Sequence, residues 1–175
     1  MRTTLLDWPE SEYIDGERFR KVSPKFTHAA VQATVLDIFR GCADDRGRAL
    51  PEWRFRIGPP GEPITALVPD VAYVSRERLR KLSREEREEP PFGPDIAVEI
   101  RSPSHRAELL ARKVRKYLSA GTVLVLDIDP ASRTVVAYSR DDVAVFAGND
   151  QFTHEAADWL HFRVSALFEE LDRPD

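Results

Sequence analysis

The sequence predicts a mixed α/β fold (α+β mixed) in which helices flank a central mixed sheet, with a hairpin and a helix at the N-terminus. Three observations support this class. Short apolar runs with strand-like alternation are separated by turn residues, one N-terminal segment has helical periodicity, and a strand, a helix and another strand follow one another between residues 95 and 128. At 175 residues, the chain is predicted to form one domain, residues 1–175.

The N-terminal segment is predicted to form a hairpin followed by a helix. Residues 10–22 alternate apolar and polar side chains around Asp15-Gly16, which is a strong turn pair. Ser23-Pro24 fits a helix cap followed by proline at the first helical position. Apolar residues recur at helical spacing over residues 26–39, and Gly41 is the expected stop.

The next strands are predicted at residues 53–57 and 64–74, and the second of them contains Asp70. Residues 76–89 carry many charges of both signs. This composition indicates an exposed helix or a mobile loop rather than a domain linker. Another strand is predicted at residues 95–100.

The C-terminal half continues with a predicted helix over residues 106–119 and an apolar run over residues 122–128. A continuous apolar run is typical of a strand that is covered on both faces. The strand–helix–strand connection should be right-handed, with its two strands parallel. Further strands are predicted at residues 134–138 and 143–146, and a terminal helix at residues 164–171.

Composition and charge exclude several classes of protein. No apolar run approaches the roughly 20 residues that span a bilayer, and residues 1–10 do not resemble a secretory signal. Cys42 is the only cysteine, so an intrachain disulfide is impossible and a reduced, cytoplasmic protein is expected. The net charge of −4 gives no overall basic footprint for nucleic acid, so such binding would need a local basic patch or a bridging metal.

Two predicted strands each carry one carboxylate among apolar neighbours, Asp70 and Glu99. Burying an isolated ionised carboxylate is costly unless a cation, a donor or a metal accompanies it. If the two strands are neighbours, the carboxylates can converge, and a divalent cation would relieve their repulsion. Oxygen ligands favour Mg²⁺ or Mn²⁺, and such a metal can activate water and bind a phosphoryl oxygen.

Basic residues near these strands could serve the same site. Lys113, on the predicted helix, could stabilise the charge that develops on a phosphate or orient water, and Lys116 competes for this role. Arg101 stays protonated and is a poor base, but it can bind phosphate in a bidentate manner. The structural alternative is that one carboxylate caps a turn and the other pairs with Arg101 or Lys113.

The chain resembles the PD-(D/E)XK nuclease superfamily in Asp70 and in Glu99-Ile100-Arg101. It resembles more closely a large bacterial family of restriction-endonuclease-like proteins that is abundant in cyanobacteria. The resemblance covers nearly the whole chain. The residues that carry it are Val98-Glu99-Ile100-Arg101-Ser102-Pro103-Ser104, Lys113-Val114-Arg115-Lys116-Tyr117, Ala120-Gly121, Asp127-Ile128-Asp129-Pro130, Asp15-Gly16-Glu17 and His28.

This resemblance implies a restriction-endonuclease-like core and a Mg²⁺ or Mn²⁺ ion held by Asp70, Glu99 and the Ile100 carbonyl. The usual lysine of the superfamily lies two residues after the glutamate, where this chain has Arg101. The resemblance places that lysine on the following helix, at Lys113. Restriction-endonuclease-like folds often dimerise, so a homodimer is also implied.

The first hypothesis is a metal-dependent endonuclease that hydrolyses phosphodiester bonds in DNA. Its catalytic residues would be Asp70, Glu99, Lys113 and Arg101, and its substrate-binding residues would be His28, Arg101 and Lys116. A second hypothesis is a non-catalytic nucleic-acid-binding or protein-interaction module on a nuclease scaffold. A third is an enzyme that acts on another phosphodiester, such as RNA or a branched intermediate.

Overall fold

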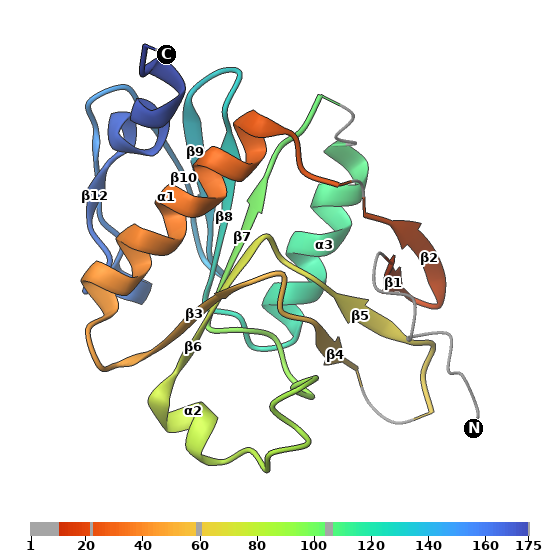
Figure 1. Cartoon of the computed structure of the whole chain (residues 1–175). Coiled ribbons are helices and arrows are strands. Elements are labelled where there is room, and N and C mark those ends of the chain that lie inside the picture. The colour runs from red at the N-terminus through yellow and green to blue at the C-terminus, as the bar shows by residue number, and fades with distance from the viewer. Residues whose placement is uncertain (1–10, 22, 59–60, 104–106, 175) are drawn as a thin grey trace.

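The computed structural model describes residues 11–21, 23–58, 61–103 and 107–174. These residues form a six-stranded sheet, a four-stranded sheet and a two-stranded ribbon, with helices packed between and over them (Figure 1). The mixed α/β class predicted from the sequence is therefore confirmed.

The six-stranded sheet is the centre of the fold. Its order is β10-β9-β8-β7-β6-β3, in which β7 and β8 are parallel and every other neighbouring pair is antiparallel. The strands in this order are β10 (Val143–Ala147), β9 (Thr134–Tyr138), β8 (Leu124–Asp129), β7 (Ile96–Ile100), β6 (Val71–Ser75) and β3 (Gly47–Pro51).

The four-stranded sheet lies beside it and has the order β2-β1-β5-β4. Its strands are β2 (Glu17–Arg20), β1 (Ser11–Ile14), β5 (Thr65–Leu67) and β4 (Phe55–Ile57). The predicted hairpin around Asp15-Gly16 is confirmed by the antiparallel pairing of β1 with β2. Both turn residues have positive φ, 52° at Asp15 and 79° at Gly16, as a tight hairpin turn requires.

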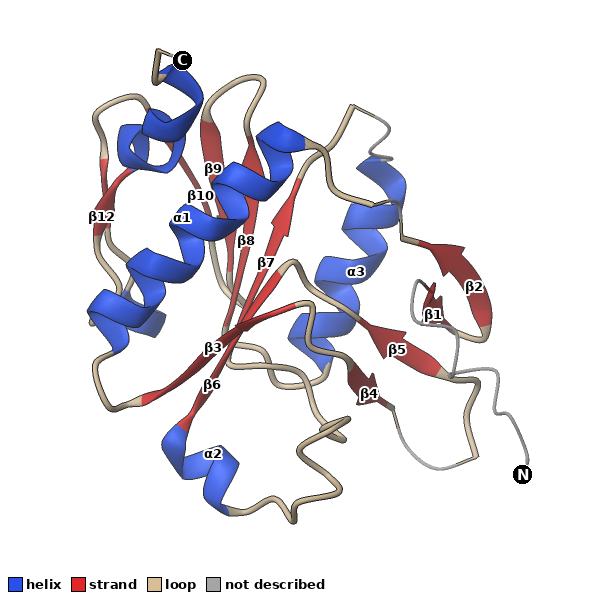
Figure 2. Ribbon diagram, in the orientation of Figure 1, coloured by secondary structure: helices blue, strands red, loops and turns tan. Residues whose placement is uncertain are grey.

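Two long helices cover opposite faces of the central sheet (Figures 1 and 2). Helix α1 (Phe26–Ala43) packs on one face together with the C-terminal segment, in a cluster that includes Phe39, Val98 and Phe168. Helix α3 (Ala107–Ser119) packs on the other face and also contacts the four-stranded sheet. Helix α3 therefore packs against both sheets with one side and exposes the other.

The remaining elements are short and lie toward the edges of the fold. They are α2 (Arg76–Arg80), the two-stranded ribbon β11 (Gln151–Phe152) and β12 (Phe162–Arg163), and the 3-10 helices η2 (Glu155–Ala157) and η3 (Val164–Asp172). The predicted exposed segment after residue 76 is confirmed as α2 followed by turns. The predicted terminal helix is present as the 3-10 helix η3.

The predicted parallel connection is confirmed, because β7 leads through α3 to β8 and the two strands pair in parallel. Side chains of β8 alternate between the two cores. Leu124, Leu126 and Ile128 join the cluster of α1, whereas Val125 joins the cluster of α3. Both faces of β8 are thus buried, which explains its continuous apolar run.

The predicted strand over residues 64–74 is wrong in one respect, because it is two strands that belong to different sheets. β5 ends at Leu67 and β6 begins at Val71, so Asp70 lies in the bend between them. Pro69, in this bend, has no N–H to donate to a strand partner. The break turns the chain from the small sheet into the central one.

The predicted limits of the first helix are also corrected. Helix α1 begins at Phe26, and its N-cap residue is Lys25, which makes no side-chain cap hydrogen bond. It continues past Gly41 to Ala43, which is buried in the core. Packing of this last turn outweighs the helix-breaking tendency of one glycine. The predicted start of α3 at Arg106 lies outside the described residues.

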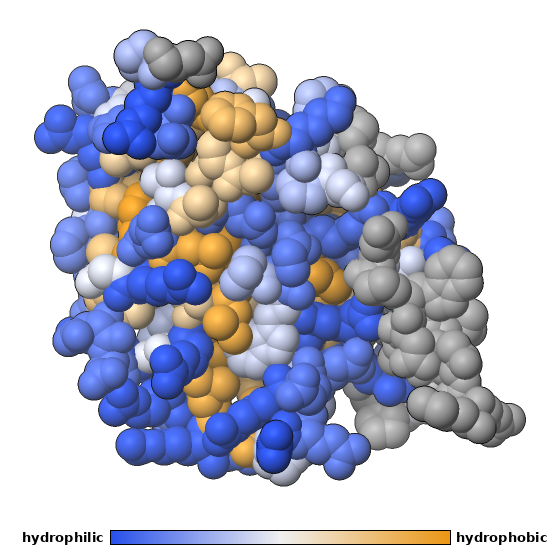
Figure 3. Space-filling model, in the orientation of Figure 1, coloured by the Kyte–Doolittle hydropathy of each residue, from blue (hydrophilic) through white to orange (hydrophobic). Residues whose placement is uncertain are grey.

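The surface combines polar margins with limited apolar exposure. In the face shown in Figure 3, hydrophobic residues gather in a strip through the middle, and hydrophilic residues surround it. Val143 and Val145, on the edge strand β10, are among the few large apolar side chains that are exposed. None of the helices in the described ranges is both long and apolar enough to cross a membrane.

Candidate functional site

Asp70 and Glu99 converge where β6 meets β7. The two strands pair antiparallel, with Val71 opposite Val98. The Oδ2 atom of Asp70 accepts a hydrogen bond of 2.6 Å from the backbone N–H of Ile100, which follows Glu99. Asp70 and Glu99 are each only 4% exposed, so the structure brings two buried carboxylates to one place, as the sequence predicted.

Asp70 is surrounded by positive charge and hydrogen-bond donors. Lys21, directly after β2, lies 3.0 Å from Oδ1, and Nε2 of His28, on the first turn of α1, lies 3.1 Å from Oδ2. Burial would raise the pKa of Asp70, but the hydrogen bond with His28 and the charge of Lys21 hold that pKa well below its ordinary value. Asp70 is therefore ionised at neutral pH.

Glu99 is held by two residues that are four positions apart on α3. Nζ of Lys113 lies 2.5 Å from Oε2, and the hydroxyl of Tyr117 donates to Oε1 at 2.8 Å. Residues four apart lie on the same side of a helix, so this face of α3 is aligned with Glu99. The sequence predicted that Lys113 could pair with Glu99, but it assigned Tyr117 no role in the site.

Lys113 is shared with a third buried carboxylate, Glu12 of β1. The Lys113 ammonium lies 2.9 Å from Oε1 of Glu12, which also accepts the backbone N–H of Val68 at 2.8 Å. Burial would lower the pKa of Lys113, but Glu12 and Glu99 raise it overall. Lys113 is therefore a permanent cation between two carboxylates.

Glu99 has the opposite electrostatic character from Asp70. Burial raises the pKa of Glu99 to about 7, because the charges of Asp70 and Glu12 add to the burial and outweigh the attraction of Lys113. Two carboxylates at one site are thus driven apart in pKa. Such a separation is a common feature of active sites, although structural ion pairs also produce it.

One side of the site is more open, at Lys21 and Glu52. The side chain of Lys21 is 22% exposed and that of Glu52 is 43% exposed, and the two lie 2.5 Å apart. Gln32, one turn after His28 on α1, donates to Oε1 of Glu52 at 2.9 Å and to the backbone carbonyl of Asp70 at 2.7 Å. This rim is the more exposed side of the site.

The donor set fits a hard divalent cation. The site holds more carboxylates than lysines, since Glu12, Glu52, Asp70 and Glu99 are accompanied by Lys21 and Lys113. Among the described side chains, no three His, Cys, Asp or Glu residues form a ready-made metal cluster. Mg²⁺ and Mn²⁺ suit such a partial set of ligands, because they are commonly held by one or two carboxylates and complete their shell with water and phosphate oxygens.

A family model described as "Uma2: Putative restriction endonuclease" matches residues 3–164. The chain belongs to the Uma2 family. The predicted membership of a restriction-endonuclease-like family is thereby confirmed.

A crystal structure supports the same assignment. The protein is described as a "putative nuclease belonging to DUF820" from Anabaena variabilis, and its structure is similar to this chain with a TM-score of 0.81 and 25% identity. The match covers 93% of this chain and 92% of the other chain. The predicted nuclease-like fold is confirmed by this likeness. A search of curated proteins found no match.

In this Uma2 chain, Arg101 is engaged away from the paired carboxylates. Its guanidinium contacts Asp127 of β8 through Nε at 2.9 Å and Nη2 at 2.5 Å, and it lies 3.5 Å from Asp129. The side chain of Asp127 is fully buried, so Arg101 compensates a buried charge. The structure therefore supports the alternative of a structural ion pair, although the partner is Asp127 rather than Glu99.

Lys116 and Ile100 differ in how they relate to the site. Lys116 pairs with Asp15 on the hairpin turn and does not join Asp70 and Glu99. Ile100 joins Asp70 through its backbone N–H, whereas the metal ligand predicted from the resemblance is its carbonyl.

Glu12, Lys21, Gln32 and Glu52 were absent from the predicted site. The available signal was weak: a glutamate among the buried positions of a predicted hairpin strand, and a lysine just after it.

Proposed function

We propose that this chain is a Mg²⁺- or Mn²⁺-dependent endonuclease that hydrolyses phosphodiester bonds in DNA. The observation that carries the proposal is the convergence of buried Asp70 and Glu99, with Lys113 bound to Glu99. Membership of a family described as "putative restriction endonuclease" favours the same activity. The surplus of carboxylate over lysine charge favours a divalent cation as the partner.

Asp70 and Glu99 would hold the metal, together with the Ile100 carbonyl named by the resemblance. A bound divalent metal would supply Lewis-acid activation of water and of a phosphoryl oxygen. Lys113 and Tyr117 fix the orientation of Glu99, and His28 fixes that of Asp70. These supporting contacts keep the two carboxylates in place before substrate arrives.

Lys21 is the basic residue best placed to meet substrate from the rim. Its ammonium contacts Asp70 at 3.0 Å, and its side chain is partly exposed. We therefore assign Lys21 a contact with the phosphate, a role that the sequence hypothesis gave to Arg101. In this assignment Lys113 is a positioning residue, because both of its carboxylate partners are buried.

Mn²⁺ titration by calorimetry, followed by a plasmid cleavage assay, tests the proposal. Asp70→Asn and Glu99→Gln each remove one charged ligand with little change in shape. Asp37→Asn, at an exposed position of α1, is the matched control. We expect wild type and the control to bind Mn²⁺ and cleave DNA, and each site variant to lose at least ~100-fold in cleavage rate.

One observation favours the second hypothesis, a non-catalytic module. Asp70 and Glu99 already have cationic and hydrogen-bonding partners, namely Lys21, His28, Lys113 and Tyr117. If this network is purely structural, wild type will show no Mn²⁺ binding and DNA binding will be unaffected by chelator. Cleavage by Glu99→Gln at the wild-type rate would also rule out the proposed active site. A parallel assay on RNA distinguishes the third hypothesis.

A further inference from the structure

A basic hollow lies on the outer side of α3, apart from the paired carboxylates. It has a volume of about 370 Å³. We call it the α3 hollow. The residues that line it are Asp15, Arg112, Arg115, Lys116 and Ser119. Three cations and one carboxylate line a surface of a protein whose net charge is −4, so the α3 hollow is locally opposite in sign to the whole chain.

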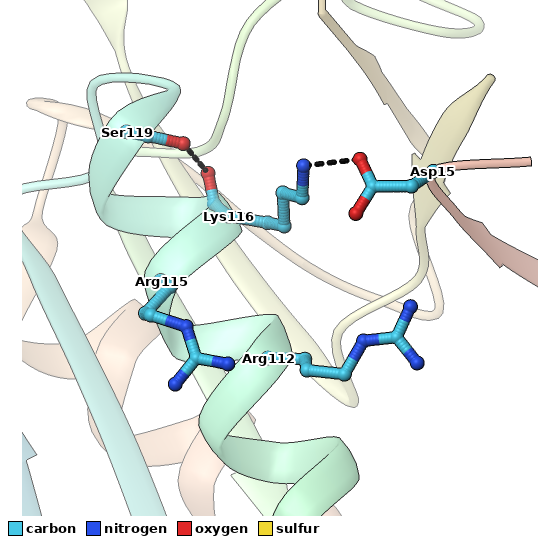
Figure 4. A pocket seen from close by; sticks show the side chains of 5 residues that line it. All are labelled: Asp15, Arg112, Arg115, Lys116 and Ser119. Carbon is cyan, nitrogen blue, oxygen red and sulfur yellow. Dashed lines mark hydrogen bonds and ion pairs between the residues drawn. The ribbon is translucent and has the colours of Figure 1, made fainter. Parts of the chain in front are cut away.

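Two of the three cations are held by the hairpin. Arg112 and Lys116 both extend from α3 toward the β1–β2 turn (Figure 4). Arg112 lies 2.8 Å from Glu17, and its guanidinium is 5.2 Å from the ring centre of Phe19. Lys116 pairs with Asp15. These partly exposed pairs are weak enough for a phosphate to replace the carboxylates.

The third cation, Arg115, is not explained by the attachment of the hairpin. Its side chain is exposed and has no hydrogen bond or ion pair with any residue that the structure describes. If this cluster only attached the hairpin to α3, Arg112 and Lys116 would be sufficient and Arg115 would not be needed. An unpaired guanidinium beside two exchangeable cations is the arrangement expected for an anion site.

The α3 hollow and the carboxylate site share two elements, helix α3 and the β1–β2 hairpin. Helix α3 directs Lys113 toward Glu99, and it directs Lys116, one turn later, toward the hairpin turn. The hairpin likewise places Glu12 inside and Asp15 outside. Three residues of helix rise about 4.5 Å, so the two places lie about one helical turn apart along α3.

We propose that the α3 hollow binds the phosphodiester backbone of DNA, with Arg115 as the unpaired contact. Arg112 and Lys116 exchange their carboxylate partners for phosphate oxygens when DNA is present. The site holds the duplex through backbone charge and does not read sequence. This inference rests on the proposed DNA substrate, and it adds a second place of contact on the protein.

The inference is tested by measuring the fluorescence anisotropy of a short fluorescein-labelled DNA duplex as protein is added. EDTA is present, so no metal contributes to the binding. Arg115→Gln removes the unpaired contact. Arg163→Gln is the matched control, because Arg163 is an exposed arginine on β12, on the opposite side of the molecule (Figure 1). We expect Arg115→Gln to weaken binding roughly fivefold to tenfold near 0.1 M salt and to lower the salt slope by about 1, and the control to bind as wild type does.

Asp15→Asn gives a result of opposite sign. Asn tolerates the positive φ of 52° at this position, so the turn is retained. Removing the competing carboxylate releases Lys116, and DNA binding should tighten by up to about fivefold, the scale of one surface ion pair. If the cluster only attached the hairpin to α3, Asp15→Asn would lower the melting temperature and leave DNA affinity unchanged.

The outcomes separate this inference from the proposed activity. Equal DNA affinity of Arg115→Gln and Arg163→Gln overturns the α3 hollow as a phosphate site, whether or not the protein cleaves DNA. The two expected shifts in affinity support it even if cleavage is absent. Absence of DNA binding by wild type in EDTA, at low as well as moderate salt, also overturns it.

Discussion

Asp70 and Glu99 lie at one site, yet the protein stabilises these two carboxylates in different ways. Asp70 is contacted by Lys21 and His28, which come from separate elements, and by the backbone N–H of Ile100. Glu99 depends on one cation, Lys113, which it shares with Glu12. The pKa of Asp70 is correspondingly lowered, and burial raises that of Glu99 to about 7.

This difference shows that local charge balance, rather than residue type, sets the pKa of a buried carboxylate. At the Asp70 end the positive charge is divided between two side chains, so no single one is essential. At the Glu99 end one lysine contacts two carboxylates, and its loss removes the cation that both of them contact. The Glu99 end should therefore be the more fragile of the two, and substitutions can test that order.

The largest expected effect is that of Lys113→Met. This change leaves Glu12 and Glu99 buried without a cation and should lower the free energy of unfolding by about 3–5 kcal/mol. Lys21→Met should cost less, about 1–2 kcal/mol, because His28 and the Ile100 amide still contact Asp70. Urea unfolding at neutral pH measures both.

Lys116→Met is the control for Lys113→Met, because it removes a lysine from the same helix at a partly exposed position. Its cost should stay below about 1 kcal/mol. If Lys113→Met fails to fold, the double variant with Glu99→Gln should recover part of the loss, since one buried charge is then removed. Equal losses for Lys113→Met and Lys21→Met would contradict the proposed difference between the two ends.

The pH dependence of stability should separate the two carboxylates. Between pH 4.5, the ordinary value for glutamate, and about 7, folded Glu99 retains a proton that the unfolded chain has released. The free energy of unfolding should therefore fall as pH rises through this window, by on the order of 3 kcal/mol. Asp70 acts in the opposite direction, because its lowered pKa stabilises the fold above its ordinary value of 3.8 and that stability is lost on acidification below it.

Urea unfolding from pH 3 to 8 measures how the free energy of unfolding changes with pH in both ranges. EDTA is present so that no metal enters the site. Glu99→Gln should flatten the curve between pH 4.5 and about 7 and leave the acid limb in place. A wild-type curve that rises through this window would show that Lys113 outweighs burial at Glu99.

A smaller effect than that of Lys113→Met is expected for Arg101→Lys. A lysine cannot reproduce the two-pronged contact with Asp127, so the fold should lose about 1–2 kcal/mol. Cleavage and Mn²⁺ affinity should stay within about twofold of wild type, because Arg101 is occupied by Asp127 rather than by the paired carboxylates. Arg48→Lys, at an exposed position of β3, is the control. A large loss of cleavage at unchanged stability would instead support the bidentate phosphate contact predicted for Arg101.

Much of the fold could be predicted from the sequence, because its signals are local. Asp15-Gly16 predicted the β1–β2 hairpin, and the apolar run after α3 predicted a strand buried on both faces. The strand over residues 64–74 was wrong because apolar character continues through the bend at Asp70, where only the change of sheet separates β5 from β6.

The candidate site was likewise predicted only in part. Asp70, Glu99 and Lys113 were found because a charge inside an apolar pattern, and a lysine one element later, are visible within a short stretch of chain. Glu12 and Lys21 were missed, because nothing near them in the chain indicates their partners. Lys113 and Glu12 are 101 positions apart, and Lys21 and Asp70 are 49 positions apart.

The sequence by itself determined which elements form and which of them carry carboxylates, since hydrophobic periodicity acts over a few residues. Only the tertiary structure decided which cation neutralises which carboxylate. Packing of the hairpin against α3 brought Glu12 to Lys113 and left Arg115 unpaired at the surface. The physical reason is that a buried charge must be compensated by whatever the fold places within a few ångströms of it, and that neighbour is set by packing rather than by order along the chain.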